Sequence, residues 1–388
     1  MIGNRLVFEV RGTQLYNKGA ELMLRACISE IKLNYPDAVI CTAPNGKAPY
    51  ERRAPLGLYQ KFWVRRGRLT IGRWGAWIPA ALRTRFGLVL DREVDVLLDA
   101  SGYCLGDHWS VRRNLQAATD VQRIARRGGT AVLLPQAMGP FTGPAVRKTA
   151  QKALDAAQLI YARDGQSFDG ARGLIPDADT LHLAPDFTGT VRRESGISEA
   201  AQVVVIPNIQ MVQKTEPAVG IRYVQWLRDV IRLLEESGVT VAIYLHDTLE
   251  DRPFGPDGTY QLSSTVACLT EEDALLLKSR IGKAGVVLSS RYHGAVNALS
   301  QGVPVFVTSW SHKYEALLAD YGVSDSVLSV NDEPAAATQR ILAALKPEEQ
   351  KRTKQLLATA IKGIEDKTAE MWGRVFALIR SRHGRDPQ

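Results

Sequence analysis

One stretch near the C-terminal end of the chain, residues 286–318, constrains the fold more than any other. It begins with an apolar run at 286–288, continues through a polar turn into apolar residues at helical spacing, and ends in a β-branched run at 303–307. This order predicts a strand, a helix and a second strand. Strands joined in this way form a right-handed crossover, and the carboxyl ends of such parallel strands meet at one edge of the sheet.

Four cationic or proton-carrying side chains follow these two predicted strands: Arg291, His293, His312 and Lys313. Arginine offers a planar fork to phosphate or carboxylate, lysine offers a point charge, and the start of a helix attracts anions. Imidazole exchanges protons near neutral pH, so His293 is the candidate proton donor. A plainer interpretation has His293 capping the helix and Arg291 in a surface ion pair. Four such groups at adjacent strand ends favour a site for an acidic ligand.

The same stretch, SSRYHGAVNALSQGVPVFVTSWSHKYEALL, resembles the C-terminal signature of the polysaccharide pyruvyl transferase family. The resemblance rests on a Ser-x-Arg-x-His-Gly turn at 289–294, a Gly-x-Pro strand entry at 302–304 and a His-Lys-Tyr sequence at 312–314. It implies transfer of the pyruvate unit of phosphoenolpyruvate onto a sugar, which gives a pyruvate ketal. It also implies two Rossmann-like α/β domains in a GT-B-like arrangement, with the active site in the interdomain cleft.

Near the N-terminus, a predicted strand at 6–10 leads into a predicted helix through the sequence Asn-Lys-Gly-Ala-Glu at 17–21. At the first turn of a doubly wound sheet, Asn17, Lys18 and Glu21 are candidates for binding sugar hydroxyls, and Gly19 would let a ligand approach the backbone. The alternative is an ordinary helix start, with Asn17 as the cap and Glu21 as an early acid. The five residues also resemble the N-terminal motif of the family, which favours an acceptor-binding role.

Further polar residues follow other predicted strands of the first half. Asp107 lies in the loop after the strand at 94–100, Arg163 follows the strand at 159–162, and Asp186 belongs to a Pro-Asp pair that resembles one in the family. Arg163 is a second candidate fork for phosphate or carboxylate, and the family places an arginine there. Asp107 and Asp186 are candidate acceptor-binding residues. The loop at 101–103 departs from the run of glycines that many family members carry.

The pattern of strands and helices predicts an N-terminal Rossmann-like domain at 1–192 on the acceptor side and a C-terminal one at 198–345 on the donor side. The polar, aperiodic segment 190–202 is the predicted linker, and helices at 346–388 are expected to bridge back to the first domain. A chain of 388 residues is long enough for two domains of ordinary size.

Between residues 52 and 90 the chain has nine basic residues and no acidic one, more positive charge than the net +8 of the whole protein. Tryptophan and phenylalanine alternate with the arginines. Such a mixture suits an interfacial helix on an anionic membrane or a groove for an anionic glycan. The alternative is a pair of helices that bury their aromatic residues and expose arginine. No nucleic-acid-binding motif accompanies the stretch, so nucleic acid is not an expected partner.

Several other classes of protein are disfavoured. The N-terminus lacks the apolar run of a signal peptide, and no eighteen consecutive residues are apolar, so the protein is expected in the cytoplasm, either free or peripherally held at the inner face of the membrane. Four cysteines at 27, 41, 104 and 268 show no metal-ligand or disulfide spacing. No metal or cofactor is expected beyond phosphoenolpyruvate as donor.

The expected function is therefore pyruvyl transfer onto a sugar of an exopolysaccharide or other polysaccharide, a glycolipid or a cell-wall precursor, including a lipid-linked one. His293 is the expected acid, and Arg163, Arg291 and Lys313 form the expected clamp for the donor's phosphate and carboxylate, with His312 beside them. Two alternatives stay open. One is a nucleotide-sugar glycosyltransferase of the same architecture, and the other is a catalytically silent glycan-binding subunit.

Overall fold

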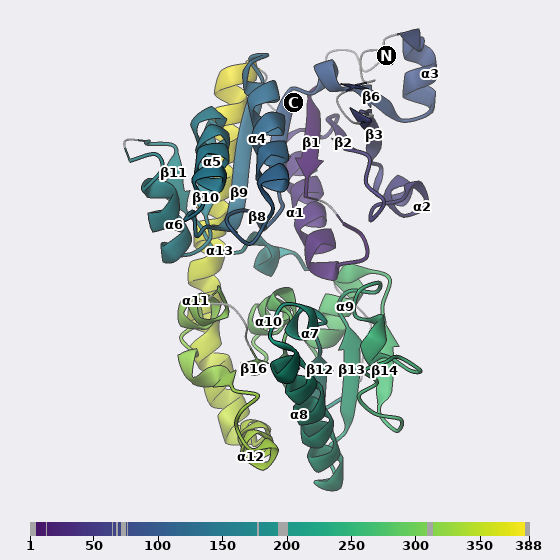
Figure 1. The fold of residues 1–388 in the computed structure, drawn as a ribbon, viewed down its shortest axis with the longest axis vertical. Coiled ribbons are helices and arrows are strands. Elements are labelled where there is room, and N and C mark those ends of the chain that lie inside the picture. Colours follow the sequence, from purple (N-terminus) through teal and green to yellow (C-terminus); the bar gives the residue numbers. More distant parts are fainter. Residues whose placement is uncertain are drawn as a thin grey trace. The chain divides into compact units, whose positions relative to one another are not determined.

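A computed structural model describes residues 5–12, 14–63, 65–66, 69–70, 75, 77–176, 178–192, 201–308 and 313–384; at 65–66 and 69–70 it describes the backbone alone. The chain divides into two compact units (Figure 1). Unit 1 comprises residues 1–15, 23–187 and 367–388, and unit 2 comprises residues 16–22 and 188–366. Most of the predicted linker lies outside the described residues, because 193–200 are not described, and His312 lies outside them with the rest of 309–312.

Unit 1 is built on a parallel sheet in the order β11-β10-β9-β7-β1-β2-β3-β6, with β8 paired to β9. Its strands are β1 (Val7–Arg11), β2 (Val39–Thr42), β3 (Tyr59–Phe62), β6 (Leu88–Leu90), β7 (Val96–Asp99), β8 (Tyr103–Leu105), β9 (Thr130–Met138), β10 (Leu159–Ala162) and β11 (Leu181–Leu183), and a separate antiparallel pair joins β4 (Arg65–Arg66) to β5 (Leu69–Thr70). Its helices are α2 (Tyr50–Arg53), α3 (Ala80–Arg85), α4 (Val111–Ala125), α5 (Pro144–Ala156) and α6 (Gly165–Arg172).

Two long helices have residues in both units. In α1 (Lys18–Asn34), the first turn belongs to unit 2 and the remainder to unit 1. In α13 (Pro347–His383), the part from Lys367 onward belongs to unit 1. There the Tyr161 hydroxyl donates to the Met371 carbonyl over 3.3 Å, and the ring of Trp372 lies edge-on to Phe187 at 5.6 Å.

The basic stretch contributes strands to the unit 1 sheet, which corrects the alternative of a helical pair. Lys61 on β3 is buried, with its ammonium group against the carboxylate of Glu9 on β1 and 3.5 Å from that of Asp91. Arg83 on α3 is also buried and is bound to Glu93, 2.7 Å from Oε2. These acidic partners lie outside the acid-free stretch, so they cannot be identified from the sequence of the stretch itself.

Unit 2 carries a six-stranded, fully parallel sheet in the order β14-β13-β12-β15-β16-β17 (Figure 1). Its strands are β12 (Val203–Ile206), β13 (Val241–Leu245), β14 (Ala267–Thr270), β15 (Val286–Ser289), β16 (Val305–Thr308) and β17 (Val327–Leu328). Its helices are α7 (Gln210–Gln213), α8 (Pro217–Glu236), α9 (Ala274–Ile281), α10 (Tyr292–Leu299), α11 (Lys313–Asp320), α12 (Pro334–Ala344) and the first part of α13. The strand order reverses between β12 and β15, and the carboxyl ends at such a reversal form the usual ligand site of an open sheet.

Alternation along the strands of unit 2 divides its core into two layers. Val203 and Val205 of β12 pack with α8 and α12, whereas Val204 and Ile206 pack with α9, α10, α11 and α13. Successive strand residues point to opposite faces, so a run of buried β-branched residues implies helices on both sides. Short 3₁₀ helices complete the chain at Ala54–Leu56, Asp91–Glu93, Phe187–Thr190, Arg252–Phe254 and Ser324–Ser326.

The strand–helix–strand prediction at 286–307 is confirmed by β15, α10 and β16. The strands β3, β6, β8 and β14 were not predicted, and β9 runs through nine buried residues to Met138. Asp273 is the cap of α9, accepting from the backbone N–H of Leu275 at 2.8 Å.

The observed division of the chain differs from the predicted domain bounds in one way that bears on the site. Residues 16–22 belong to unit 2, because the backbone there pairs with the segment after β13. The Lys18 N–H donates to the His246 carbonyl at 2.9 Å, and the Thr248 N–H donates to the Tyr16 carbonyl at 3.0 Å. The Asn17–Glu21 motif is therefore part of the same unit as His293.

Candidate functional site

The Ser-x-Arg-x-His-Gly turn connects β15 to α10, and the side chain of Ser289 closes it. The Ser289 hydroxyl accepts from the Arg291 N–H at 3.1 Å and donates to the Arg291 carbonyl at 2.8 Å. At the other end, a Cβ on Gly294 would lie 2.5 Å from the Ser289 oxygen and 3.0 Å from Ile206. Serine and glycine are therefore required for α10 to begin this close to the sheet.

Ser290, the next residue of the turn, is held by neighbours from three other elements. Its carbonyl accepts from the Asn208 amide at 2.9 Å and from the Tyr314 hydroxyl at 2.7 Å, and its own hydroxyl accepts from Tyr223 at 2.8 Å. These groups are all buried. The backbone that presents the next three residues is thus rigidly positioned, as a reacting group requires.

Arg291 was predicted to clamp the donor, but its guanidinium fork is occupied within the protein. The Asp251 carboxylate accepts from Nε at 2.9 Å and also from Nη2, and both side chains are buried. Burial alone would lower the pKa of Arg291, but the adjacent Asp251 raises it above its usual range, so the arginine stays charged. Asp251 also accepts the backbone N–H of Ile209 and Asp247, both at 3.0 Å. Arg291 is therefore a residue that fixes the site's backbone.

The Asn17–Glu21 segment forms the start of α1, and its side chains make the contacts of a helix start. Asn17 caps the helix, accepting from the Ala20 N–H at 3.2 Å. Lys18 is fully buried, with Nζ 3.0 Å from a Glu21 carboxylate oxygen and 2.8 Å from the Glu272 carbonyl. The contacts of Asn17 are thus those of a helix cap, which was the alternative interpretation of this residue. The charges of Lys18 and Glu21 compensate each other inside unit 2.

Gly19 faces His293. A Cβ placed on Gly19 would lie 2.2 Å from Nδ1, 2.4 Å from Cγ and 2.8 Å from Cβ of His293, where ordinary contacts are 3.4 to 4 Å. The glycine was predicted to let a ligand approach the backbone. In the structure the imidazole of His293 takes that place.

His246, at the carboxyl end of β13, lies in the same cluster and is almost completely buried. Its Nε2 is 3.3 Å from the amide nitrogen of Asn297 on α10. Burial lowers the pKa of His246 well below its ordinary value, and the nearby cationic side chains of Arg291 and Lys18 lower it further. His246 is therefore neutral at pH 7.

Lys313, the first residue of α11, lies beside the aromatic residues that flank His293. Its Nζ is 5.7 Å from the ring centre of Tyr292 and 5.5 Å from that of Tyr314, and the Tyr292 ring is 5.3 Å from that of His293. Lys313 is half-buried and thus keeps one side toward solvent. His312, predicted beside it, lies outside the described residues.

In unit 1, the structure brings together two predicted residues, Arg163 and Asp186. Both are buried, and Nη1 of Arg163 donates to the Asp186 carboxylate at 3.3 Å. A Cβ on Gly102 would lie 3.9 Å from the same Nη1, so the altered 101–103 loop borders the arginine. Asp164 is the cap of α6, accepting from the Ser167 N–H at 2.7 Å.

Asp107 is engaged by a neighbouring loop. Its carboxylate accepts from the backbone N–H and the hydroxyl of Thr142, at 2.7 and 2.6 Å, and from the Gly143 N–H at 3.3 Å. Slight burial opposes the effect, but these hydrogen bonds lower the pKa of Asp107 below its usual value. The contacts fix the entry to α5.

Three residues of the unit 2 cluster were not among the predicted site residues: His246, Asp251 and Asn297. For His246 the sequence contains a signal, because His246 and Asp247 directly follow the apolar run 239–245. Asp251 and Asn297 carried none, because a lone aspartate in a turn-rich loop and an asparagine within a helix are usually structural.

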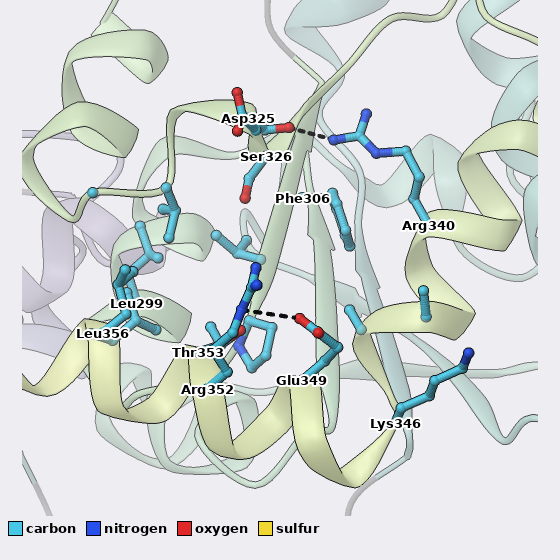
Figure 2. A pocket seen from close by; sticks show the side chains of 17 residues that line it. Leu299, Phe306, Asp325, Ser326, Arg340, Lys346, Glu349, Arg352, Thr353 and Leu356 are labelled. Carbon is cyan, nitrogen blue, oxygen red and sulfur yellow. Dashed lines mark hydrogen bonds and ion pairs between the residues drawn. The ribbon is translucent and has the colours of Figure 1, made fainter.

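A cavity of unit 2 lies elsewhere. It has a volume of about 770 Å³, and its lining includes Phe306 of β16 and Pro304 just before that strand (Figure 2). Figure 2 shows two interactions among its lining residues: Arg352 pairs with Glu349 at 3.3 Å, and Arg340 donates to the backbone carbonyl of Asp325. None of the predicted site residues lines it, so we place the candidate site at the carboxyl ends of β12, β13 and β15.

Across the described ranges, no group of three or more His, Cys, Asp or Glu side chains is arranged to hold a metal ion. Among the helices that the structure describes, none has the length and apolarity needed to cross a bilayer.

A family model described as polysaccharide pyruvyl transferase matches residues 17–312 of the chain. No curated protein matches its sequence. Similar solved structures include a putative UDP-N-acetylglucosamine 2-epimerase from Listeria monocytogenes, with a TM-score of 0.59, 13% identity and coverage of 99% of this chain and 98% of that one. The UDP-GlcNAc 2-epimerase from Neisseria meningitidis gives 0.58 and 13%, covering 96% and 99%, and spinosyn forosaminyltransferase gives 0.54 and 12%, covering 97% and 99%. At these identities the likeness concerns the fold, and it confirms the predicted GT-B-like class with two parallel-sheet domains.

Proposed function

Because the chain belongs to the polysaccharide pyruvyl transferase family, we propose that it transfers the pyruvate unit of phosphoenolpyruvate onto two hydroxyls of a sugar. The acceptor is a sugar of a polysaccharide, glycolipid or cell-wall precursor, and the product is a pyruvate ketal. The family match indicates a transferase. The donor, the acceptor and the residue roles below are our proposal.

The proposed reaction needs one acid and a site that stabilises negative charge. A proton adds to the methylene carbon of phosphoenolpyruvate, which becomes a methyl group, and positive charge develops on the carbon that bears the phosphate. A sugar hydroxyl attacks that carbon and loses its proton. The carbon–oxygen bond to phosphate then breaks, and a second hydroxyl adds and loses its proton to close the ketal. Phosphate leaves with the remaining proton.

We assign the acid to His293, and the observation that carries the assignment is its contrast with His246. Both follow strands of the unit 2 sheet at their carboxyl ends, but His246 is buried and neutral at pH 7. His293 is half-buried at the start of α10, on a turn that Ser289 and Ser290 fix. A proton donor must be held accurately and still reach its substrate, and His293 meets both conditions.

The donor's anionic groups are assigned to the start of α10 and to Lys313 in unit 2. Backbone N–H groups at a helix start attract phosphate and carboxylate. Lys313 lies next to Tyr292, adjacent to the proposed acid. Arg163 keeps the role proposed from the sequence, with Asp186 orienting its guanidinium. For Arg291 we propose positioning of the turn in place of the donor clamp expected from the sequence, a role that its ion pair with Asp251 supports.

The acid assignment is tested with His293→Ala. We expect loss of phosphate release from phosphoenolpyruvate in the presence of acceptor, with donor affinity within about tenfold of wild type, because a proton donor acts mainly in the transition state. His108→Ala, at an exposed histidine, is the control and should retain activity. Near-normal turnover of His293→Ala contradicts the assignment.

The donor assignment is tested with Arg163→Ala and a thermal-shift assay. Phosphoenolpyruvate should raise the melting temperature of the wild type, and Arg163→Ala should weaken its binding by about 1.5 to 3 kcal/mol, the range for a hydrogen bond to a charged group. Arg232→Ala, at an exposed arginine of α8, serves as the control. Stabilisation by a nucleotide diphosphosugar and not by phosphoenolpyruvate would instead indicate a glycosyltransferase.

A further inference from the structure

Unit 1 exposes a cluster of large apolar side chains around α3. Trp77 is 85% exposed, Phe86 is 64% exposed and Leu82 is 45% exposed. Among the exposed large hydrophobic residues that the structure describes, the aromatic ones are Tyr50, Trp77 and Phe86, and all three fall within residues 50–86. Single exposed apolar residues are ordinary, but three within ten residues of chain mark an interaction surface.

The surrounding structure holds these side chains outward. The buried Arg83 donates from Nε to the Ile78 carbonyl at 3.2 Å and binds Glu93 with Nη1, which ties α3 to the body of the unit. Before Trp77, a Cβ on Gly75 would lie 2.5 Å from the Phe62 ring and 2.7 Å from Leu90, so the chain packs tightly there. The exposure of the apolar residues is thus fixed by the anchoring of their neighbours.

Leu82 and Phe86 share one side of α3. The Phe86 N–H donates to the Leu82 carbonyl at 3.0 Å, which places these two residues one helical turn apart. Arg85 lies between them in sequence and is exposed. Figure 1 shows α3 beside β6, the last strand of the sheet order, at the periphery of its unit.

Within residues 52–90 the charge has one sign. Of the nine basic residues between 52 and 90, Arg53, Lys61 and Arg83 are buried, and the pairs of Lys61 and Arg83 use acids from outside the stretch. The other six basic residues include Arg52 and the exposed Arg85. Two more of the six, Arg68 and Arg73, lie outside the described residues, as does the aromatic residue Trp74. An acid-free, arginine-rich segment creates a positive potential.

We propose that Trp77, Leu82 and Phe86 form a docking surface for an anionic lipid bilayer. Tryptophan, phenylalanine and leucine partition into the headgroup and acyl boundary, while an exposed basic residue such as Arg85 is attracted to anionic headgroups. The surface holds the protein on the bilayer without a membrane-spanning helix. This lipid-binding role goes beyond the proposed transfer reaction and does not depend on that reaction, because lipid binding is measured without donor or acceptor.

The test is co-sedimentation of the full chain with vesicles of phosphatidylcholine alone or with phosphatidylglycerol. The double variant Trp77→Ser/Phe86→Ser should bind the anionic vesicles about tenfold or more weakly than wild type, because two interfacial aromatic residues are lost. The matched control is Leu33→Ser/Ile221→Ser, which removes two residues that are 77% and 71% exposed elsewhere. It should bind like wild type. Arg85→Gln should weaken binding at low salt and have less effect at high salt.

A second measurement places the side chain in the bilayer. Brominated lipid should quench part of the tryptophan fluorescence of bound wild type, and Trp77→Phe should lose that part while still binding. Because the substituted residues are exposed, the melting temperatures of the variants should match that of the wild type within the usual range for surface changes.

Equal vesicle binding by wild type and the double variant overturns the proposal, as does failure of wild type to bind either vesicle. If sedimentation velocity instead shows a self-association that the double variant abolishes, the surface belongs to a contact between copies of the chain. If the protein binds a soluble anionic glycan and does not bind vesicles, the surface belongs to the acceptor-binding site.

Discussion

Replacing Gly19 by alanine is the sharpest perturbation of the candidate site, because it adds one carbon against the proposed acid. That carbon would lie 2.2 Å from Nδ1 of His293, more than 1 Å closer than the 3.4 Å at which ordinary contact begins. Rotation of the imidazole does not relieve the clash, since Cβ of His293 would itself be 2.8 Å away. The starts of α1 and α10 must therefore move apart.

The substitution is expected to lower the reaction rate more than the stability of the folded protein. A displacement of about 1 Å at a reacting group costs roughly 100-fold in rate, so kcat/KM should fall by about that factor. Overpacking should destabilise the protein by about 1 to 3 kcal/mol. Alanine favours a helix over glycine by about 1 kcal/mol, which offsets part of that loss. Catalysis and stability should thus respond unequally.

The assay follows phosphate release from phosphoenolpyruvate with a polymeric or lipid-linked glycan acceptor, alongside urea unfolding. Gly363→Ala is a matched control, because Gly363 also lies in a helix but an added Cβ would meet nothing within 4 Å. It should keep wild-type kinetics and gain up to about 1 kcal/mol of stability. Histidine NMR signals add a direct readout, since the chain has six histidines and the signals of His293 and the neighbouring His246 should shift more than the others.

The reasoning is refuted if Gly19→Ala folds and keeps kcat/KM within about threefold of wild type, because a 1 Å shift of the acid cannot be that mild. A loss of activity that matches the loss of folded protein would also refute it. In that case Gly19 serves packing alone.

Two further predictions concern the groups around His293. Because the pKa of His246 in the folded protein lies well below that of the unfolded chain, the unfolded state binds more protons in acid, and stability should fall as the pH drops below about 6.5, by up to about 1.4 kcal/mol per pH unit. His246→Gln should flatten that part of the pH profile in urea unfolding, and an unchanged slope contradicts the assignment. Asp251→Asn leaves the buried Arg291 without its counter-charge and should cost about 3 to 5 kcal/mol of unfolding free energy, so a loss below about 1 kcal/mol would mean that the pair does not hold the turn.

The sequence predicted the elements around the site because their signals are local. The apolar run before Ser289 and the periodicity after Gly294 identified β15 and α10. The motif at 289–294 also identified the family, and the family match confirms it. The strands β3 and β6 were missed because Lys61 and the arginines made their segment look like a surface, although the sheet buries it.

The partners of the charged residues could not be predicted. Arg291 looked like a substrate clamp, because the sequence does not show that Asp251, forty residues away, fills its fork. Lys61 looked exposed, because its partner Glu9 is fifty-two residues away on β1.

The sequence by itself thus determined the strands and the helix around the candidate site, and that an arginine and a histidine follow β15. The tertiary structure alone decided that Gly19 faces His293 and that Asn17, Lys18 and Glu21 belong to unit 2. The physical reason is that periodicity, capping and turn chemistry act within a few residues, whereas counter-charges and close packing are set by which strands lie side by side. That order is a property of the whole sheet, and no short stretch of sequence contains it.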